Sequence, residues 1–209
     1  MSLAIDVAVT IILLSLFCIS HSILASNKVK KLFQYRFGNR IAYYRIGYNI
    51  ISVISFIIIY HLLPTINITL YDLPSPYDLI ILFFQLLSLI GFIWSTRYFS
   101  SGEFIGWSQI KRLRKGNYDS NDLDENSTLR IEGPYKYSRH PIYFFSIVFL
   151  VMRPVMSLSY FIIVVIFVVY FYIGSVFEEK RLVEKFGEAY MKYQKSVPRI
   201  IPIKIFRAY

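Results

Sequence analysis

The sequence predicts an all-α integral membrane bundle of five transmembrane segments, followed by an amphipathic C-terminal helix on the cytoplasmic side. Hydrophobic residues make up 56% of the 209 residues, and charged residues only 17%. The apolar residues lie in runs of about 20, the length that a helix needs to cross ~30 Å of hydrocarbon. A soluble bundle would carry a polar face on every helix, whereas segments 47–63 and 155–177 have almost none. We therefore expect the lipid bilayer to be a partner of this chain.

Five segments are expected to cross the membrane, and the fourth in chain order is short. It covers 142–152 and lies between two prolines. Pro141 suits the first turn of a helix, where its missing N–H costs nothing. Pro154 ends the helical pattern because it removes a backbone donor. The other four runs are long enough to cross alone, and they cover 3–25, 42–63, 78–98 and 157–177.

The short segment has a consequence for the loop before it. A helix of about eleven residues rises only ~16 Å, so 142–152 does not reach across the hydrocarbon layer. We expect the loop 133–140 to enter the membrane from one side, since irregular backbone is tolerated there if it lines a protein cavity. We treat 1–209 as a single membrane domain. Its three-helix part covers 1–100, and 101–209 hold the loop, a hairpin of the last two segments and the C-terminal helix.

The charges of the loops predict the orientation. The first and third loops and the tail are rich in Lys and Arg, whereas the second, 64–77, has no basic residue and the fourth has only Arg153. By the positive-inside rule the N-terminus lies outside and the C-terminus in the cytoplasm. The formal net charge of +10 then reflects topology and contact with anionic lipid. Since no basic motif with interleaved aromatic residues is visible, we expect no nucleic-acid partner.

The tail and one loop have patterns of their own. Residues 178–195 predict an amphipathic helix, with Leu182, Phe186, Tyr190 and Tyr193 on one stripe, and such a helix can lie flat on a membrane. Residues 116–128 are polar and acid-rich, so we expect a mobile insert. Cys18 is the only cysteine, which excludes an intrachain disulfide, and no spacing of His or carboxylates resembles a zinc site.

Ionisable residues gather where the last two segments meet the cytoplasm. Residues 132–143 read Glu-Gly-Pro-Tyr-Lys-Tyr-Ser-Arg-His-Pro-Ile-Tyr, and the last apolar run ends in a pair of glutamates. Ionisable groups are costly near lipid and therefore mark functional sites. A hairpin would bring its two polar ends together, so we expect one cytosol-facing catalytic group made of Arg139, His140, Glu178 and Glu179. The basic pair suits a carboxylate or phosphate, and the glutamates suit a cationic or hydroxyl-rich ligand.

Structural alternatives exist for these residues, and the sequence leaves them open. Glu178 and Glu179 have the alternative of a solvated helix end, and His140 that of a capping residue before Pro141. His21 lies near the cytoplasmic end of the first segment. An intramembrane His is a candidate substrate contact by default, and its alternative is a helix–helix hydrogen bond.

Two blocks of residues carry a family resemblance. The first is Gly-Pro-Tyr-Lys-Tyr-Ser-Arg-His-Pro-Ile-Tyr at 133–143. The second combines Glu178 and Glu179 with Leu182, Phe186, Gly187, Tyr190, Tyr193, Val197, Pro198, Arg199 and Pro202. Together they resemble the signature of the isoprenylcysteine carboxyl methyltransferase superfamily, which includes phospholipid N-methyltransferases. The resemblance covers about 125–203. It implies an integral membrane enzyme that uses S-adenosylmethionine (SAM).

The first half of the chain resembles one branch of that superfamily. His21-Ser22 and the segment 104–109 are similar to nurim and the methanethiol S-methyltransferases. Carried over by position, the cofactor contacts of the superfamily fall on Gln109, Thr128, Leu129, Arg130, Tyr135, His140, Pro141, Tyr143 and Glu179. In the prenylcysteine enzymes an arginine on the last helix holds the substrate carboxylate, and this chain has none at 160–177.

The resemblance implies a SAM-dependent methyltransferase that acts on an apolar or membrane-embedded acceptor, such as a prenylcysteine carboxylate. The alternative acceptor is a small thiol. The alternative of another class is a non-catalytic, nurim-like membrane protein. A carboxylate acceptor needs no general base, whereas a thiol or an amine does, and Glu178, Glu179 or His140 could serve.

Overall fold

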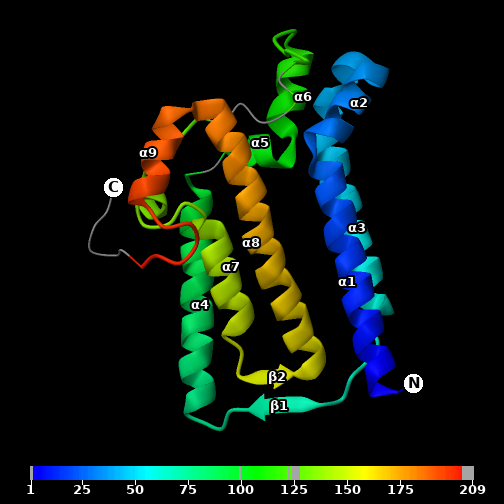
Figure 1. The fold of residues 1–209 in the computed structure, drawn as a ribbon, viewed down its shortest axis with the longest axis vertical. Helices are drawn as coiled ribbons and strands as arrows, with labels where there is room; N and C mark the ends of the chain where they lie inside the picture. The colour runs from blue at the N-terminus through cyan, green and yellow to red at the C-terminus, as the bar shows by residue number, and fades with distance from the viewer. Residues whose placement is uncertain (1, 99, 122, 124–127, 204–209) are drawn as a thin grey trace. The chain divides into compact units, whose positions relative to one another are not determined.

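The computed structural model describes residues 2–98, 100–121, 123 and 128–203, and most of these residues are helical (Figure 1). The chain forms two compact units. Unit 1 comprises Met1–Pro64 and Ser100–Thr128, and unit 2 comprises Thr65–Phe99 and Leu129–Tyr209. The expectation of a single membrane domain stays a prediction.

Unit 1 is built on two long helices that pack against each other, α1 and α3. Ser26 separates α1 from the next helix, because its hydroxyl accepts a bond from the backbone N–H of Val29 and caps that helix. Gly106 has a φ of 102°, a left-handed conformation that favours glycine, and it turns the chain sharply between two short helices. The elements are α1 (Leu3–Ala25), α2 (Asn27–Phe37), the 3₁₀ helix η1 (Gly38–Tyr43), α3 (Tyr44–Leu62), α5 (Ser101–Ile105) and α6 (Trp107–Arg114).

Unit 2 contains the motif-bearing half of the chain. Its elements are β1 (Thr69–Asp72), α4 (Tyr77–Thr96), the 3₁₀ helix η2 (Gly133–Lys136), α7 (Pro141–Val151), β2 (Val155–Ser157), α8 (Leu158–Phe186) and α9 (Glu188–Ser196). Helices α4 and α7 lie side by side (Figure 1). Ser88, Gly91 and Ser95 form a buried stripe of small residues on α4. A Cβ at Gly91 would overlap the ring of Phe145, so the missing side chain lets the two backbones approach.

A two-stranded antiparallel sheet links the segment before α4 to the turn between α7 and α8. Tyr71 pairs with Met156 and Asp72 with Val155. The hydroxyl of Ser157 then accepts a bond from the backbone N–H of Tyr160 and caps α8. The sequence did not predict these strands, because three or four residues are too few to show an alternating pattern. The sheet ties the start of α4 to the start of α8 within unit 2.

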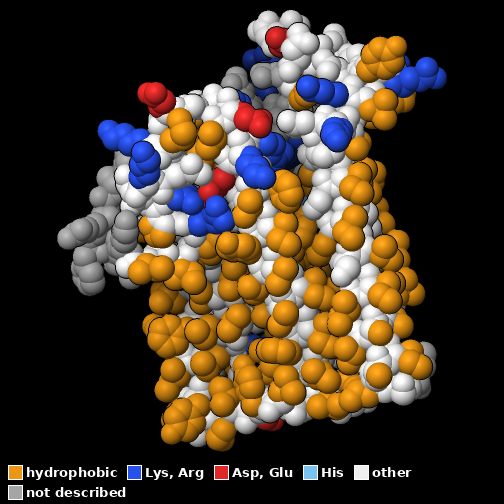
Figure 2. Space-filling view, viewed as in Figure 1, with side chains coloured by type: hydrophobic (Ala, Val, Ile, Leu, Met, Phe, Trp, Pro, Cys, Tyr) orange, Lys and Arg blue, Asp and Glu red, His pale blue; other side chains and the backbone are white. Residues whose placement is uncertain are grey.

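The membrane character of the chain is confirmed at the level of its helices. Among the described residues, four helical stretches are long and apolar enough to cross a bilayer. They contain the predicted segment 3–25 and all but one or two residues of 42–63, 78–98 and 157–177. Helix α7 is apolar but has only 11 residues, so the count of five transmembrane segments stays a prediction. In Figure 2, apolar side chains cover α4, α7 and most of α8, and charged side chains gather where α8 passes into α9.

The tail differs from the single amphipathic helix predicted at 178–195. Helix α8 continues past Glu178 to Phe186 because residues 178–186 contain no Gly or Pro, and Gly187 with a φ of 57° ends it. Helix α9 then starts at Glu188. The apolar stripe is also buried: Tyr190 and Tyr193 are each 2% exposed and pack against Leu129 and other apolar residues of unit 2. Of the predicted insert at 116–128, residues 122 and 124–127 lie outside the described residues.

Candidate functional site

The side chain of Glu179 is the centre of a buried polar cluster in unit 2. Its carboxylate accepts two bonds from Arg139, from Nε to Oε1 at 2.8 Å and from Nη2 to Oε2 at 3.0 Å. Nε2 of His140 lies 3.1 Å from Oε1. Nε2 of Gln194 and Nη2 of Arg199 donate to Oε2 at 3.0 and 3.2 Å. The prediction that the Arg139-His140 motif and the glutamate pair lie together is therefore confirmed in geometry.

The backbone holds this motif in place from the other side. Arg139 and His140 donate their N–H groups to the carbonyls of Pro198 and Arg199, at 3.0 and 2.9 Å. The hydroxyl of Ser138 donates to the carbonyl of Ile200 at 2.7 Å. These bonds pair the segment before α7 with the segment after α9. The turn at 138–140 is thus held to the tail by main-chain bonds, and the side chains of Arg139 and His140 point at Glu179.

The guanidinium of Arg139 is hydrogen-bonded to other groups of the protein through Nε, Nη1 and Nη2. Besides its two bonds to Glu179, its Nη1 donates to the carbonyls of Gln194 and Val197 at 2.7 and 2.6 Å. Those carbonyls belong to the C-terminal end of α9, where cations are stabilising. Its side chain is only 8% exposed. This geometry favours a structural role for Arg139, and its predicted catalytic role stays a prediction.

His140 lies between two carboxylates of different character. Nε2 faces Glu179, which is buried, and Nδ1 lies 3.5 Å from Oε2 of Glu178, whose side chain is 38% exposed. The hydroxyl of Tyr143 donates to the same Glu178 oxygen at 2.9 Å. The imidazole stacks on the Tyr143 ring at 5.2 Å, and that ring stacks on Phe171. A bond from Nε2–H to the Glu179 carboxylate leaves Nδ1 as the ring nitrogen that faces Glu178.

The remaining predicted residues of unit 2 surround this cluster at different depths. Pro141 is buried at the first position of α7. Burial raises the pKa of Tyr135 to about 12, with a further contribution from the nearby Glu178 carboxylate, so this phenol stays protonated at neutral pH. Leu129 packs against the apolar cluster of Tyr190. Arg130 is exposed.

Three predicted residues belong to unit 1, namely His21, Gln109 and Thr128. Their membership of the same site as Glu179 stays a prediction. His21 joins α1 to α3, because its Nδ1 lies 2.9 Å from Oγ of Ser52 and its Nε2 lies 2.6 Å from the Tyr48 hydroxyl. These contacts support the structural alternative of a helix–helix hydrogen bond. Gln109 is buried and donates to the carbonyl of Glu103, and its Oε1 has no hydrogen-bond partner among the described residues.

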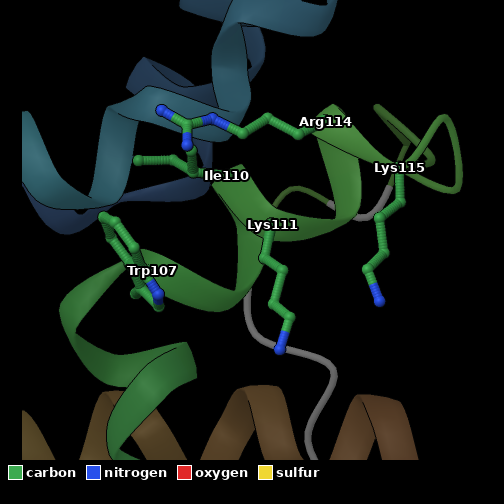
Figure 3. Close-up of a pocket in the computed structure, with 5 residues that line it drawn as sticks. All are labelled: Trp107, Ile110, Lys111, Arg114 and Lys115. Carbon is green, nitrogen blue, oxygen red and sulfur yellow. The ribbon is translucent and has the colours of Figure 1, made fainter.

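A hollow of about 320 Å³ lies on α6 in unit 1 (Figure 3). Its lining is basic and apolar, and it contains none of the predicted site residues. Such a combination of residues is typical of a helix at a membrane surface. The lining residues are Trp107, Ile110, Lys111, Arg114 and Lys115.

Two members of the Glu179 cluster were missed as site residues. Arg199 stands in the second motif block, but the sequence showed no role for it. Gln194 had no signal at all, because a lone Gln on a helix resembles any solvated residue. As for metals, the described residues contain no group of three or more His, Cys, Asp or Glu side chains that could hold an ion.

Comparison with known proteins agrees with the motifs. The family model for phospholipid methyltransferase matches residues 90–189. Methanethiol S-methyltransferase 1 of Bradyrhizobium diazoefficiens is 25% identical over 94% of this chain and 67% of its own length. The methanethiol S-methyltransferase of Crocosphaera subtropica is 25% identical over 91% of the chain and 72% of its own length. That of Pseudomonas deceptionensis is 27% identical over 93% and 72%. No solved structure gave a significant match. The predicted superfamily resemblance is confirmed.

Proposed function

We propose that this protein, a membrane methyltransferase related to the phospholipid methyltransferases, uses SAM to methylate a small thiol. The position of His140 between Glu178 and Glu179 carries this proposal. A thiol must lose its proton before it becomes a good nucleophile, and this imidazole is placed to accept one. A carboxylate acceptor, as in the prenylcysteine alternative, would need no such base.

Two further observations support the thiol over a prenylcysteine carboxylate. The apolar part of α8 has no Lys, Arg or His at 158–177 that could hold a substrate carboxylate. The three relatives compared above are named methanethiol S-methyltransferases and align over most of this chain. Methanethiol is therefore the first substrate to test.

The residues of the cluster fit SAM. Its sulfonium and its ammonium group are cationic, and Glu178 offers a partly exposed carboxylate beside the stacked rings of Tyr143 and Phe171. The carboxylate of SAM requires a cationic donor, and Nε of Arg199 is buried without an acceptor among the described residues. When bound, SAM supplies an electrophilic methyl group on sulfur.

The chain's own residues would prepare the nucleophile. Glu179 holds Nε2–H of His140 and thereby leaves Nδ1 to take up the thiol proton. Glu178 then stabilises the imidazolium through its oxygen at 3.5 Å. Tyr143 donates to that oxygen and keeps Glu178 in place. General-base catalysis of this kind contributes about 10²–10⁴-fold, and alignment of the reactants contributes the rest.

The test is an assay of purified protein in nanodiscs with radiolabelled SAM. Methanethiol, a prenylcysteine and phosphatidylethanolamine are offered separately. We expect label in dimethyl sulfide only. Label in prenylcysteine ester alone would overturn the thiol proposal and restore the first expectation. If SAM neither stabilises the protein against heat nor reacts, the non-catalytic, nurim-like alternative holds. By the positive-inside rule, the proposed site faces the cytoplasm.

A further inference from the structure

Two arginines bind the buried carboxylate of Glu179, and they differ in how many of their N–H donors already have an acceptor in the protein. Arg139 uses Nε, Nη1 and Nη2 in bonds to Glu179 and to two carbonyls at the end of α9. Arg199 makes its bond to Glu179 through Nη2 alone. Its Nε is buried and has no acceptor among the described residues. Arg199 is therefore the member of the pair with donors available.

The position of Arg199 is well determined. Its carbonyl accepts the backbone N–H of His140 at 2.9 Å, so its main chain is held to the turn before α7. Its guanidinium lies over the Tyr172 ring, 5.5 Å from the ring centre. The side chain is 31% exposed, compared with 8% for Arg139. A ligand can reach Arg199, whereas Arg139 is enclosed.

A guanidinium carries five N–H donors in one plane, and a buried charged donor without an acceptor is costly. Buried donors in folded proteins are nearly always satisfied, by protein, by water or by a ligand. The partner that matches a planar guanidinium best is a carboxylate or a phosphate. The geometry of Arg199 is thus that of an anion-binding residue beside the proposed catalytic group.

We propose that Arg199 binds the carboxylate of the methionine part of SAM, an inference that rests on the proposed function. That carboxylate is the only anionic group of the methyl donor. Glu178 and Glu179 repel it, while Glu178 attracts the ammonium and sulfonium groups. Arg199 therefore orients the donor by the sign of its charges, and it discriminates whole SAM from nucleosides that lack the amino-acid part.

The test compares two ligands that differ in the amino-acid part, which contains the proposed contact group. S-adenosylhomocysteine carries the amino-acid part, and 5′-methylthioadenosine carries the same nucleoside and sulfur without it. Binding of both is measured by calorimetry in phosphatidylcholine nanodiscs. We expect Arg199→Gln to lower the affinity for S-adenosylhomocysteine by about tenfold or more, as the loss of a charge-assisted pair predicts. Its affinity for 5′-methylthioadenosine should change by less than about twofold, within ordinary context effects on binding.

Two variants serve as controls. Lys192→Gln removes the same charge from the exposed face of α9 and should leave both affinities unchanged. Arg199→Lys keeps the charge and should recover part of the lost affinity. Ligand-free thermal unfolding shows whether Arg199→Gln has disturbed the cluster.

Each other outcome overturns the inference in a recognisable way. An equal loss for both ligands means that Arg199 only supports Glu179. No loss for either ligand places the carboxylate elsewhere. If phosphatidylglycerol nanodiscs weaken S-adenosylhomocysteine binding in the wild type but not in Arg199→Gln, then a lipid phosphate is the natural anion. If the wild type binds neither ligand, the proposed function itself fails.

Discussion

Each unit of this protein contains a buried glutamate that accepts two bonds from one arginine, but that arginine lies nine residues away in unit 1 and forty residues away in unit 2. In unit 1, Glu103 pairs with Arg112, nine residues away. This local pair joins α5 to α6 across the turn at Gly106. In unit 2, Glu179 is bound from 15 to 40 residues away by Arg139, His140, Gln194 and Arg199.

The difference shows how a cluster can serve both stability and chemistry. A local ion pair stabilises one turn. The distributed cluster holds the start of α7, the end of α8 and the segment after α9 together, because each of them contributes a donor to one carboxylate. Once Glu179 has fixed these groups, Glu178 is left partly exposed beside His140, and Arg199 keeps a donor. The same arrangement therefore holds the Glu179 cluster rigid and leaves Glu178 and Arg199 accessible to a ligand.

The largest effect is expected from Glu179→Ala. It would leave two guanidinium groups and a His without their shared partner, and breaking a buried pair costs about 3–5 kcal/mol. Thermal or denaturant unfolding in detergent should show this loss. Glu103→Ala is the matched control, with a smaller expected loss because Arg112 is partly exposed. Equal losses would show that the reach of the partners does not matter.

Glu178→Gln should act on catalysis and leave stability nearly unchanged. The amide cannot stabilise the imidazolium, so we expect kcat with methanethiol to fall by about 10²-fold. The unfolding temperature should move little because Glu178 is partly exposed. Kinetics and unfolding measured on one preparation separate the two effects. A fall in stability without a change in kcat would assign Glu178 to the structural cluster.

Substitution of the two arginines, Arg112 and Arg139, tests the same comparison with smaller expected changes in the free energy of unfolding. Arg112→Gln should cost about 1 kcal/mol, because Glu103 is buried but the Arg112 side chain is partly exposed. Arg139→Gln should cost several times more, since it also frees the carbonyls of Gln194 and Val197. Chemical denaturation of both variants provides the measurement. If Arg112→Gln proves the more destabilising variant, the local pair is the main support.

The smaller of the two effects on catalysis is expected from Tyr143→Phe. It removes one hydrogen bond to Glu178 and keeps the ring that stacks between His140 and Phe171. A bond of about 1–2 kcal/mol predicts a roughly fivefold to thirtyfold fall in kcat. Tyr143→Leu is the harsher companion, because it also removes the stacking. Unchanged activity in both variants would exclude Tyr143 from positioning Glu178.

The sequence alone determined the helices and the meeting of two motifs. Apolar runs of spanning length are a local property, and the expected segments agree with α1, α3 and α4 within a few residues, whereas α8 runs nine residues beyond the expected end at 177. The turn between α7 and α8 returns the chain, so that Arg139-His140 and Glu178-Glu179 lie at the same end of unit 2. The superfamily motifs at these positions pointed to methyl transfer, which the comparisons support.

Tertiary structure alone decided the role of each residue within the Glu179 cluster. Whether an arginine is used up or available depends on acceptors far away in sequence, such as the carbonyls of Gln194 and Val197 for Arg139. The pairing of β1 with β2 and the burial of Tyr190 and Tyr193 have the same origin. Local pattern reports the hydrophobicity and propensity of a segment, whereas hydrogen-bond saturation is settled only when distant segments compete for the same donors and acceptors.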